Sequence, residues 1–155
     1  IPYYLKADIV GSERICLKAL LEFENKPDYI SIRSEKVIWT NLLEEFDLFE
    51  KLGYDRFKAV QQDFTDFSVM LNGEKYTFAE GASGVFAEDT EGKWRTQEQV
   101  LKDYHRIFTL YWLFGDYSYL IQKEGGRKFI AQLERIVRRP LPGWYDTHAK
   151  HSSVK

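Results

Sequence analysis

Short β-rich segments alternate with amphipathic helical segments over the start of the chain, and this alternation limits the fold more than any other feature. The pattern predicts strands at residues 3–9, 29–33 and 56–61, separated by helices at residues 13–24 and 36–52. Strands that alternate with helices pair in parallel through right-handed crossovers. We therefore predict an α/β fold built on a parallel sheet.

The chain changes character after the third predicted strand. Residues 68–71 and 75–78 flank Asn72-Gly73, which is typical of an antiparallel hairpin with a type I′ turn. A loop over residues 80–94 follows, and it holds the chain's one glycine cluster. That cluster does not stand between a strand and a helix, so it is not a phosphate or cofactor fingerprint.

Helices are predicted for most of the remaining chain. Thr96 and Gln99 form a capping box ahead of a helix that we expect to end near Phe114. A last helix is expected at residues 127–138, followed by a tail at 142–155 that we expect to be poorly ordered at its end. We divide the chain into the sheet-forming residues 1–95 and a helical extension and tail, residues 96–155, packed on the same domain.

Composition excludes several classes of protein. The chain has 155 residues, of which 44% are hydrophobic, enough for one folded domain with a real core. Its net charge of −2 gives no global attraction to nucleic acid or to an anionic membrane, and no apolar run approaches the ~20 residues that span a bilayer. The single cysteine, Cys16, cannot form an internal disulfide, which favours a cytoplasmic protein.

The turn after the first predicted strand carries the first candidate site. Asp8 ends the strand, where a buried carboxylate needs a partner or a task, and Gly11 lets the backbone turn sharply. Ligands bind outside the carboxyl ends of strands in open α/β sheets. The alternative is purely structural, with Ser12 as a helix N-cap and Glu13 as an acid that favours the helix dipole.

Several segments together resemble the FkbM-type family of S-adenosylmethionine-dependent methyltransferases. The segments, in chain order, are LKADIVGSE (5–13), CLKALLEF (16–23), PDYISIRSEK (27–36), GYDRFKAVQ (53–61) and GWYDTHA (143–149). The likeness covers nearly the whole chain. It implies a Rossmann-like methyltransferase sheet and transfer of a methyl group from S-adenosylmethionine to a hydroxyl of a sugar, glycan or other natural product.

The resemblance places this chain in the C-terminal half of such a domain, from the fourth strand onward. The family's glycine-rich cofactor loop and the acid after its second strand have no counterpart here. We therefore expect the 155 residues alone neither to bind S-adenosylmethionine tightly nor to catalyse methyl transfer. Pairing with a missing N-terminal half or with another copy is the expected assembly. The resemblance implies Asp8 and Glu13 as catalytic residues. It implies substrate contacts at Lys6, Gly11, Ser12 and Glu35.

Two positions depart from the family pattern. Val10 stands where the family has a glutamate, and Arg33 stands where an acid is expected after the second strand. Both changes remove negative charge at the ends of neighbouring strands. They leave open whether the site is inactive or altered in specificity.

The predicted tail holds a second candidate pair. Asp146 and His148 are two residues apart in what we expect to be a loop, close enough for a carboxylate to orient an imidazole near a substrate. The alternative is that Trp144 and Tyr145 simply anchor the tail on the domain. Three histidines and one cysteine scattered along the chain do not predict a metal site.

Other functions remain open from the sequence. A non-catalytic binding or assembly module derived from the same fold would explain the lost acids and the aromatic helix at residues 104–114. Arginines at 127–139 could contact phosphates, although such a run is more often the solvated face of a helix, and we do not expect nucleic-acid binding. The expected partner is a small-molecule or glycan acceptor, with no membrane partner.

Overall fold

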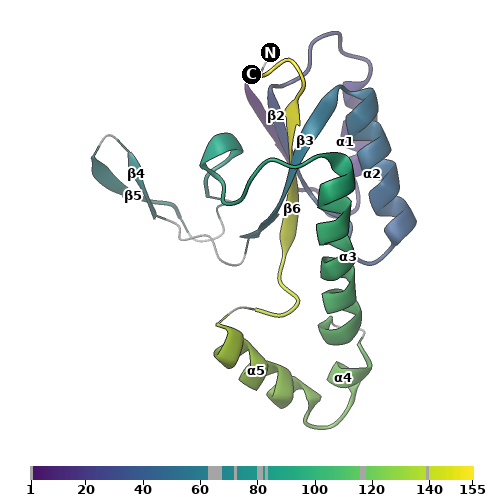
Figure 1. The fold of residues 1–155 in the computed structure, drawn as a ribbon, viewed down its shortest axis with the longest axis vertical. Coiled ribbons are helices and arrows are strands. Elements are labelled where there is room, and N and C mark those ends of the chain that lie inside the picture. Colours follow the sequence, from purple (N-terminus) through teal and green to yellow (C-terminus); the bar gives the residue numbers. More distant parts are fainter. Residues whose placement is uncertain are drawn as a thin grey trace.

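A computed structural model describes residues 2–62, 68–71, 73–79, 82, 84–115, 118–138 and 140–155. Its centre is a four-stranded mixed sheet with the order β1-β2-β6-β3 (Figure 1). The strands are β1 (Tyr4–Ala7), β2 (Tyr29–Arg33), β3 (Tyr54–Gln61) and β6 (Tyr145–His151). β1 and β2 are parallel, and β6 runs antiparallel to both β2 and β3. The predicted α/β class is confirmed and the first three strands share one direction, but the sheet is mixed and not parallel, because β6 lies between β2 and β3.

Three helices cover one face of this sheet, and two others extend beyond it (Figure 1). The covering helices are α1 (Glu13–Leu20), α2 (Trp39–Lys51) and α3 (Gln97–Phe114). The other two are α4 (Tyr119–Gln122) and α5 (Gly126–Val137). A hairpin of β4 (Ser68–Leu71) and β5 (Glu74–Thr77) forms a separate sheet, and a short 3-10 turn, η2 (Ala87–Asp89), precedes α3. Among the described residues, no helix is long and apolar enough to cross a membrane.

The C-terminal segment corrects our sequence expectation. It is not a loosely ordered tail, because residues 145–151 pair along their length with β2 on one side and β3 on the other. Asp146 and His148 therefore lie in a central strand and not in a loop. The helical extension thus returns to the sheet, and the chain's last strand completes it.

The two faces of the sheet differ in chemistry because successive side chains along a strand point to opposite sides. Ile30, Ile32, Phe57 and Ala149 share the face under the helices, where all four are buried. The opposite face carries a row of polar side chains in register across all four strands: Lys6, Ser31, His148 and Lys58.

An aromatic cluster fixes the helical layer to the sheet. Phe46 of α2 packs edge-on against Phe57 of β3 and Tyr104 of α3, with ring centroids 5.1 and 5.9 Å apart. All three side chains are fully buried. Edge-to-face pairs of this kind add roughly 0.5–1.5 kcal/mol beyond the area that they bury.

Local sequence signals are realised at most of the predicted boundaries. Thr96 and Gln99 form the complete capping box at the start of α3, and Gly53 follows α2 with a φ of 91°. The hairpin pairs Leu71 with Glu74, which leaves the predicted two-residue connection. The residue types of α1 do not decide which side is buried: the apolar Ile15 is exposed, whereas Glu13 and Leu17 are buried.

Deleting residues 143–155 should abolish cooperative unfolding, because the deletion removes a strand hydrogen-bonded on both sides, leaves β2 paired with β1 alone and takes from β3 its neighbour in the sheet. Deleting only residues 154–155, which lie beyond the sheet, should leave a sharp transition. Chemical denaturation followed by circular dichroism distinguishes the two. A cooperative transition in the longer deletion would show that β6 is dispensable.

Candidate functional site

The carboxyl ends of β1, β2 and β3 meet at one edge of the sheet, together with the start of the antiparallel β6. The register places Arg33 beside Asp146, and Val60 on the other side of Asp146. In open α/β sheets this edge is where ligands bind. We call Lys6, Asp8, Arg33, Trp144 and Asp146 the edge cluster.

A buried ion pair forms the centre of the edge cluster. Lys6 Nζ donates to Asp146 Oδ2, and the Asp146 side chain is fully buried while that of Lys6 is 22% exposed. Burial raises the pKa of Asp146 above its ordinary value, although Lys6 opposes the shift. The negative charge of Asp8 adds to the increase, whereas Trp144 opposes it. The Arg33 guanidinium lies 5.2 Å from the centre of the Trp144 ring.

The turn after β1 is more open than the sequence indicates. Ala7 is buried, but Asp8 itself is exposed, so the expected cost of burying its carboxylate does not arise. Gly11 has a φ of 83° and open space around it. Ser12 precedes α1 but makes no side-chain capping bond. Asp8 is thus accessible to a ligand, and its negative charge contributes to the raised pKa of Asp146.

His148 is enclosed in the polar face of the sheet. Its side chain is 2% exposed, and its Nε2 atom has no hydrogen-bond partner among the described residues. Burial, with the nearby charges of Lys6 and Lys58, lowers the pKa of His148 to about 3. An imidazole with this pKa stays neutral near pH 7 and is poorly matched to proton transfer there. Asp146 bonds Lys6, so the expected carboxylate–imidazole pair is replaced by an ion pair.

A second acidic group lies behind the first turn of α2. Glu35 Oε1 accepts hydrogen bonds from the backbone N–H groups of Lys36 and Val37, both at 2.8 Å, in the loop ahead of α2. Glu45 Oε2 accepts from the Glu35 N–H at 3.3 Å. Burial, together with the charges of Glu35 and Glu13, raises the pKa of Glu45 to about 8. Glu45 is therefore predominantly protonated at pH 7.

Glu13 completes this acidic group without a hydrogen-bond partner for its Oε1 atom in the described part of the chain. It is 5% exposed, on the same face of α1 as Leu17. The structure thus brings Glu13 and Glu35 together through Glu45, and it brings Lys6 and Asp146 together with Asp8. The acidic group therefore lies on the helical side of the sheet, and the Lys6–Asp146 ion pair lies on its polar face.

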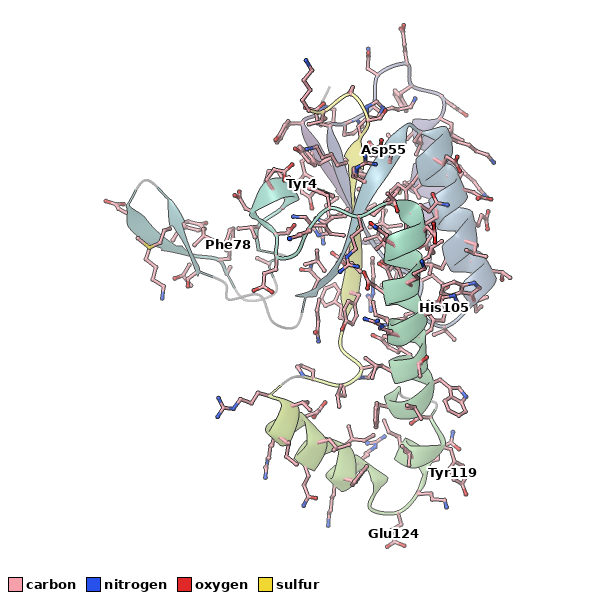
Figure 2. All side chains as sticks on the ribbon, viewed as in Figure 1. Tyr4, Asp55, Phe78, His105, Tyr119 and Glu124 are labelled. Carbon is pink, nitrogen blue, oxygen red and sulfur yellow. The ribbon has the colours of Figure 1, made fainter. Side chains whose placement is uncertain are left out.

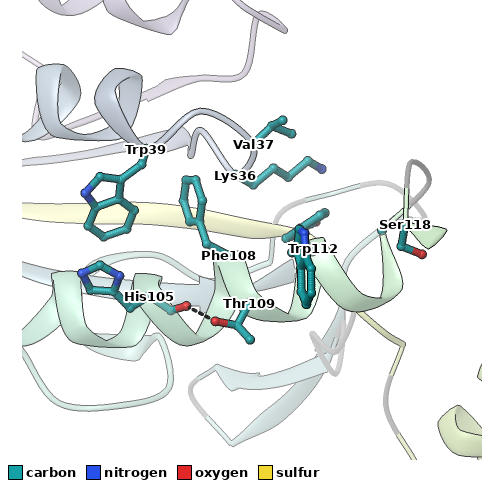
Figure 3. Close-up of a pocket in the computed structure, with 10 residues that line it drawn as sticks. Lys36, Val37, Trp39, His105, Phe108, Thr109, Trp112 and Ser118 are labelled. Atoms are coloured by element: carbon teal, nitrogen blue, oxygen red, sulfur yellow. Dashed lines mark hydrogen bonds between the residues drawn. The ribbon is translucent and has the colours of Figure 1, made fainter. Parts of the chain in front are cut away.

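An aromatic cavity of about 560 Å³ opens between the start of α2 and the C-terminal half of α3 (Figure 3). Trp39 stacks on His105 with ring centroids 4.0 Å apart, and Phe108 packs edge-on against Trp39. Lys36 Nζ lies 4.8 Å from the centre of the Tyr111 ring. Trp112 lines the cavity and is 77% exposed. The cavity offers flat apolar walls and one cation to a ring-shaped ligand.

Sequence reasoning missed several residues of this region. The aromatic run at residues 104–114 does not by itself indicate a cavity, yet Phe108, Tyr111 and Trp112 line one. Glu45 gave no signal, because an acid in a helix with charged neighbours is ordinarily exposed. Arg33 was read only as a lost acid, although its position opposite Asp146 follows from pairing that the sequence did not predict. Within the described residues, no group of three or more His, Cys, Asp or Glu side chains is arranged to hold a metal ion.

Replacing Glu45 with glutamine should increase stability more at pH 8 than at pH 5. Between pH 4.5 and about 8 the folded protein keeps the Glu45 proton that the unfolded chain has lost, so stability falls as the pH rises. The maximum slope for one group is about 1.4 kcal/mol per pH unit. We expect the difference between Glu45→Gln and wild type, measured by urea denaturation, to widen across this range.

The neighbouring Glu44 provides a matched control. Lys18 and Arg14 lower its pKa, so Glu44 is ionised in both the folded and the unfolded states over most of this range. The difference between Glu44→Gln and wild type should therefore stay nearly constant from pH 6 to pH 8. Parallel pH profiles for the two variants would show that Glu45 is not held protonated.

Comparisons with known proteins add no evidence on function, so the function is inferred from the geometry of the site. No family model, curated protein or solved structure matches the chain.

Proposed function

We propose that this chain is the acceptor-binding part of an S-adenosylmethionine-dependent O-methyltransferase that acts on a hydroxyl of a sugar, glycan or natural product. The observation that carries the proposal is the strand order β1-β2-β6-β3, with β6 antiparallel between two strands that run the other way. A closing strand inserted in this manner is typical of the C-terminal half of Rossmann-like methyltransferase sheets. A shared strand order does not by itself imply a shared function, so the side chains at the site must support the assignment separately.

The site supports it through the chemistry available at the carboxyl edge. Asp8 is an exposed carboxylate beside the Lys6–Asp146 ion pair, and it can accept a hydrogen bond or a proton from an acceptor hydroxyl. The aromatic cavity begins at Lys36, one residue after Glu35. Flat side chains such as Trp112 suit the apolar face of a sugar or of another ring. Methyl transfer depends chiefly on aligning the acceptor oxygen with the methyl carbon, so positioning is the main task of these residues.

The residues present do not fit the cofactor. The turn between β1 and α1 contains a single glycine, Gly11, whose surroundings are open. Arg33 stands after β2, where the family pattern has an acid. The proposal therefore assigns these residues to the acceptor and leaves S-adenosylmethionine, which supplies the methyl group, to residues outside this chain.

Calorimetric titration with S-adenosylhomocysteine tests the proposal. The chain is compared with a version extended upstream as far as its gene encodes. Binding only by the extended version supports an acceptor-binding part. Binding by the 155 residues alone would show that the cofactor site has been misplaced. The absence of binding by both would favour a non-catalytic module, for which size-exclusion chromatography should then show one defined oligomer.

Replacing Asp8 with asparagine should lower kcat of the cofactor-binding form by roughly 10²–10⁴-fold if the carboxylate acts as a general base. Because the Asp8 side chain is exposed, the substitution should change thermal stability little. Asp55→Asn, at another exposed aspartate whose side chain is 51% accessible, is the control and should keep full activity. Equal rates for both variants would remove Asp8 from the chemistry.

A further inference from the structure

Helix α5 stands apart from the domain that carries the sheet. It follows α4 at the far end of α3, and Figure 1 shows it extending from that corner away from the helical layer. Tyr119 and Glu124 mark this end of the molecule in Figure 2. Ile130 is buried, at 5% exposure, whereas the other side chains of the helix are half-buried or exposed. Most of α5 is therefore free to contact something else.

Much of the apolar side of α5 is exposed, although Ile130 on it is buried. Its apolar residues recur at helical spacing on one face: Phe129, Ile130, Leu133, Ile136 and Val137. Phe129 is 50% exposed, Ile136 is 77% exposed and Val137 is 48% exposed. Isolated exposed apolar residues are ordinary, but three on one face of one helix form a contact surface.

The opposite side of α5 is strongly basic. Arg127, Lys128 and Arg135 lie on it, with Arg138 directly after the helix. Residues 119–139 contain six Lys or Arg and two Asp or Glu, which is a net charge of +4. The whole chain has a net charge of −2, so the remaining residues carry −6. Positive charge is thus concentrated on a helix that also exposes several apolar side chains.

We propose that α5 is an amphipathic helix that binds the surface of an anionic phospholipid membrane. A helix of this type lies in the plane of the interface with its apolar face among the acyl chains. The arginines and lysines reach phosphate groups around it, because long basic side chains extend toward charge while their stems cover apolar surface. Tyr119 is 70% exposed next to α5, and aromatic rings of this kind are favoured at the level of the headgroups.

The apolar face favours lipid over nucleic acid. Phosphate contacts with DNA or RNA need only the basic side, and they would leave Phe129, Ile136 and Val137 in water. An anionic membrane satisfies both sides of the helix at once. The acidic remainder of the molecule would be repelled from the same surface, so charge also selects the side that attaches.

The connection between α4 and α5 holds the helix in its projecting position. Gly125 has a φ of 82°, and a Cβ atom on Gly126 would lie 1.6 Å from the backbone oxygen of Leu120. Lys123 Nζ lies 4.4 Å from the centre of the Tyr119 ring. Glycine is thus required where the two helices meet closely.

Co-sedimentation with vesicles tests the proposal on the chain as it exists. We expect binding to vesicles of phosphatidylcholine mixed with phosphatidylserine, little binding to phosphatidylcholine alone, and weaker binding as salt rises. Arg127→Gln, Lys128→Gln and Arg135→Gln combined should weaken binding roughly fivefold for each charge removed. Phe129→Ser combined with Ile136→Ser should weaken it by roughly tenfold or more.

Matched variants elsewhere separate this surface from general effects. Lys51→Gln, Lys75→Gln and Arg106→Gln remove the same charge from other exposed positions. Ile15→Ser changes an apolar residue of α1 that is 67% exposed. Both controls should bind vesicles nearly as wild type does. Circular dichroism and thermal unfolding would be used to check that the α5 variants remain folded.

Three results would overturn the proposal. One is no binding to the mixed vesicles, and another is equal binding to neutral and anionic vesicles. The third is α5 variants that bind as the controls do. Salt-sensitive binding to duplex DNA or to RNA without vesicle binding would assign the basic side to nucleic acid instead.

Discussion

The pairing of β6 with both β2 and β3 is the constraint on which the rest of the molecule depends. It joins the first and last parts of the chain, and it places Asp146, Thr147 and His148 between two parallel strands. On the helical side, Thr147 Oγ1 lies 2.6 Å from Ser34 Oγ and 2.5 Å from Tyr104 OH, which ties β6 to α3. On the other side, Asp146 receives the Lys6 ammonium. One strand therefore positions both the hydroxyl network and the ion pair.

Polar groups are buried in that strand, in β3 and in α2, which is costly unless each group is satisfied. Lys58 meets the requirement through the backbone oxygens of Ala87 and Thr90. His148 and Glu45 meet it by remaining neutral, since burial lowers the pKa of one and raises that of the other. The two shifts oppose each other: the lowered pKa of His148 makes stability fall as the pH drops from about 6.5 to about 3, and the raised pKa of Glu45 makes it fall as the pH rises from about 4.5 to about 8. Such groups restrict the pH range of greatest stability.

Local signals predicted the parts of this fold that depend on local chemistry. The capping box fixed the start of α3, and the two-residue connection fixed the β4–β5 hairpin, because each is set by neighbouring residues. The strand YDTHAKH was missed, although its Tyr145, Thr147 and Ala149 alternate with polar residues as a strand requires. Its position in the sheet could not be predicted, because it pairs with β3 about ninety residues away and with β2 more than a hundred residues away, and such pairing depends on tertiary contacts. Burial of Glu13 instead of Ile15 has the same origin, since packing chose the face of α1.

The two proposals place the candidate site and the membrane surface at the same end of the molecule. Arg33 and Gln61, at the ends of β2 and β3, pair with Asp146 and Tyr145 at the start of β6. The chain reaches β6 directly from α5, so the carboxyl edge of the sheet is the edge on the α5 side (Figure 1). A molecule attached through α5 would hold Asp8 and the aromatic cavity on its membrane side. An acceptor whose hydroxyl lies at or near a lipid surface would then reach the site without leaving the membrane. Its diffusion to the site would be confined to two dimensions.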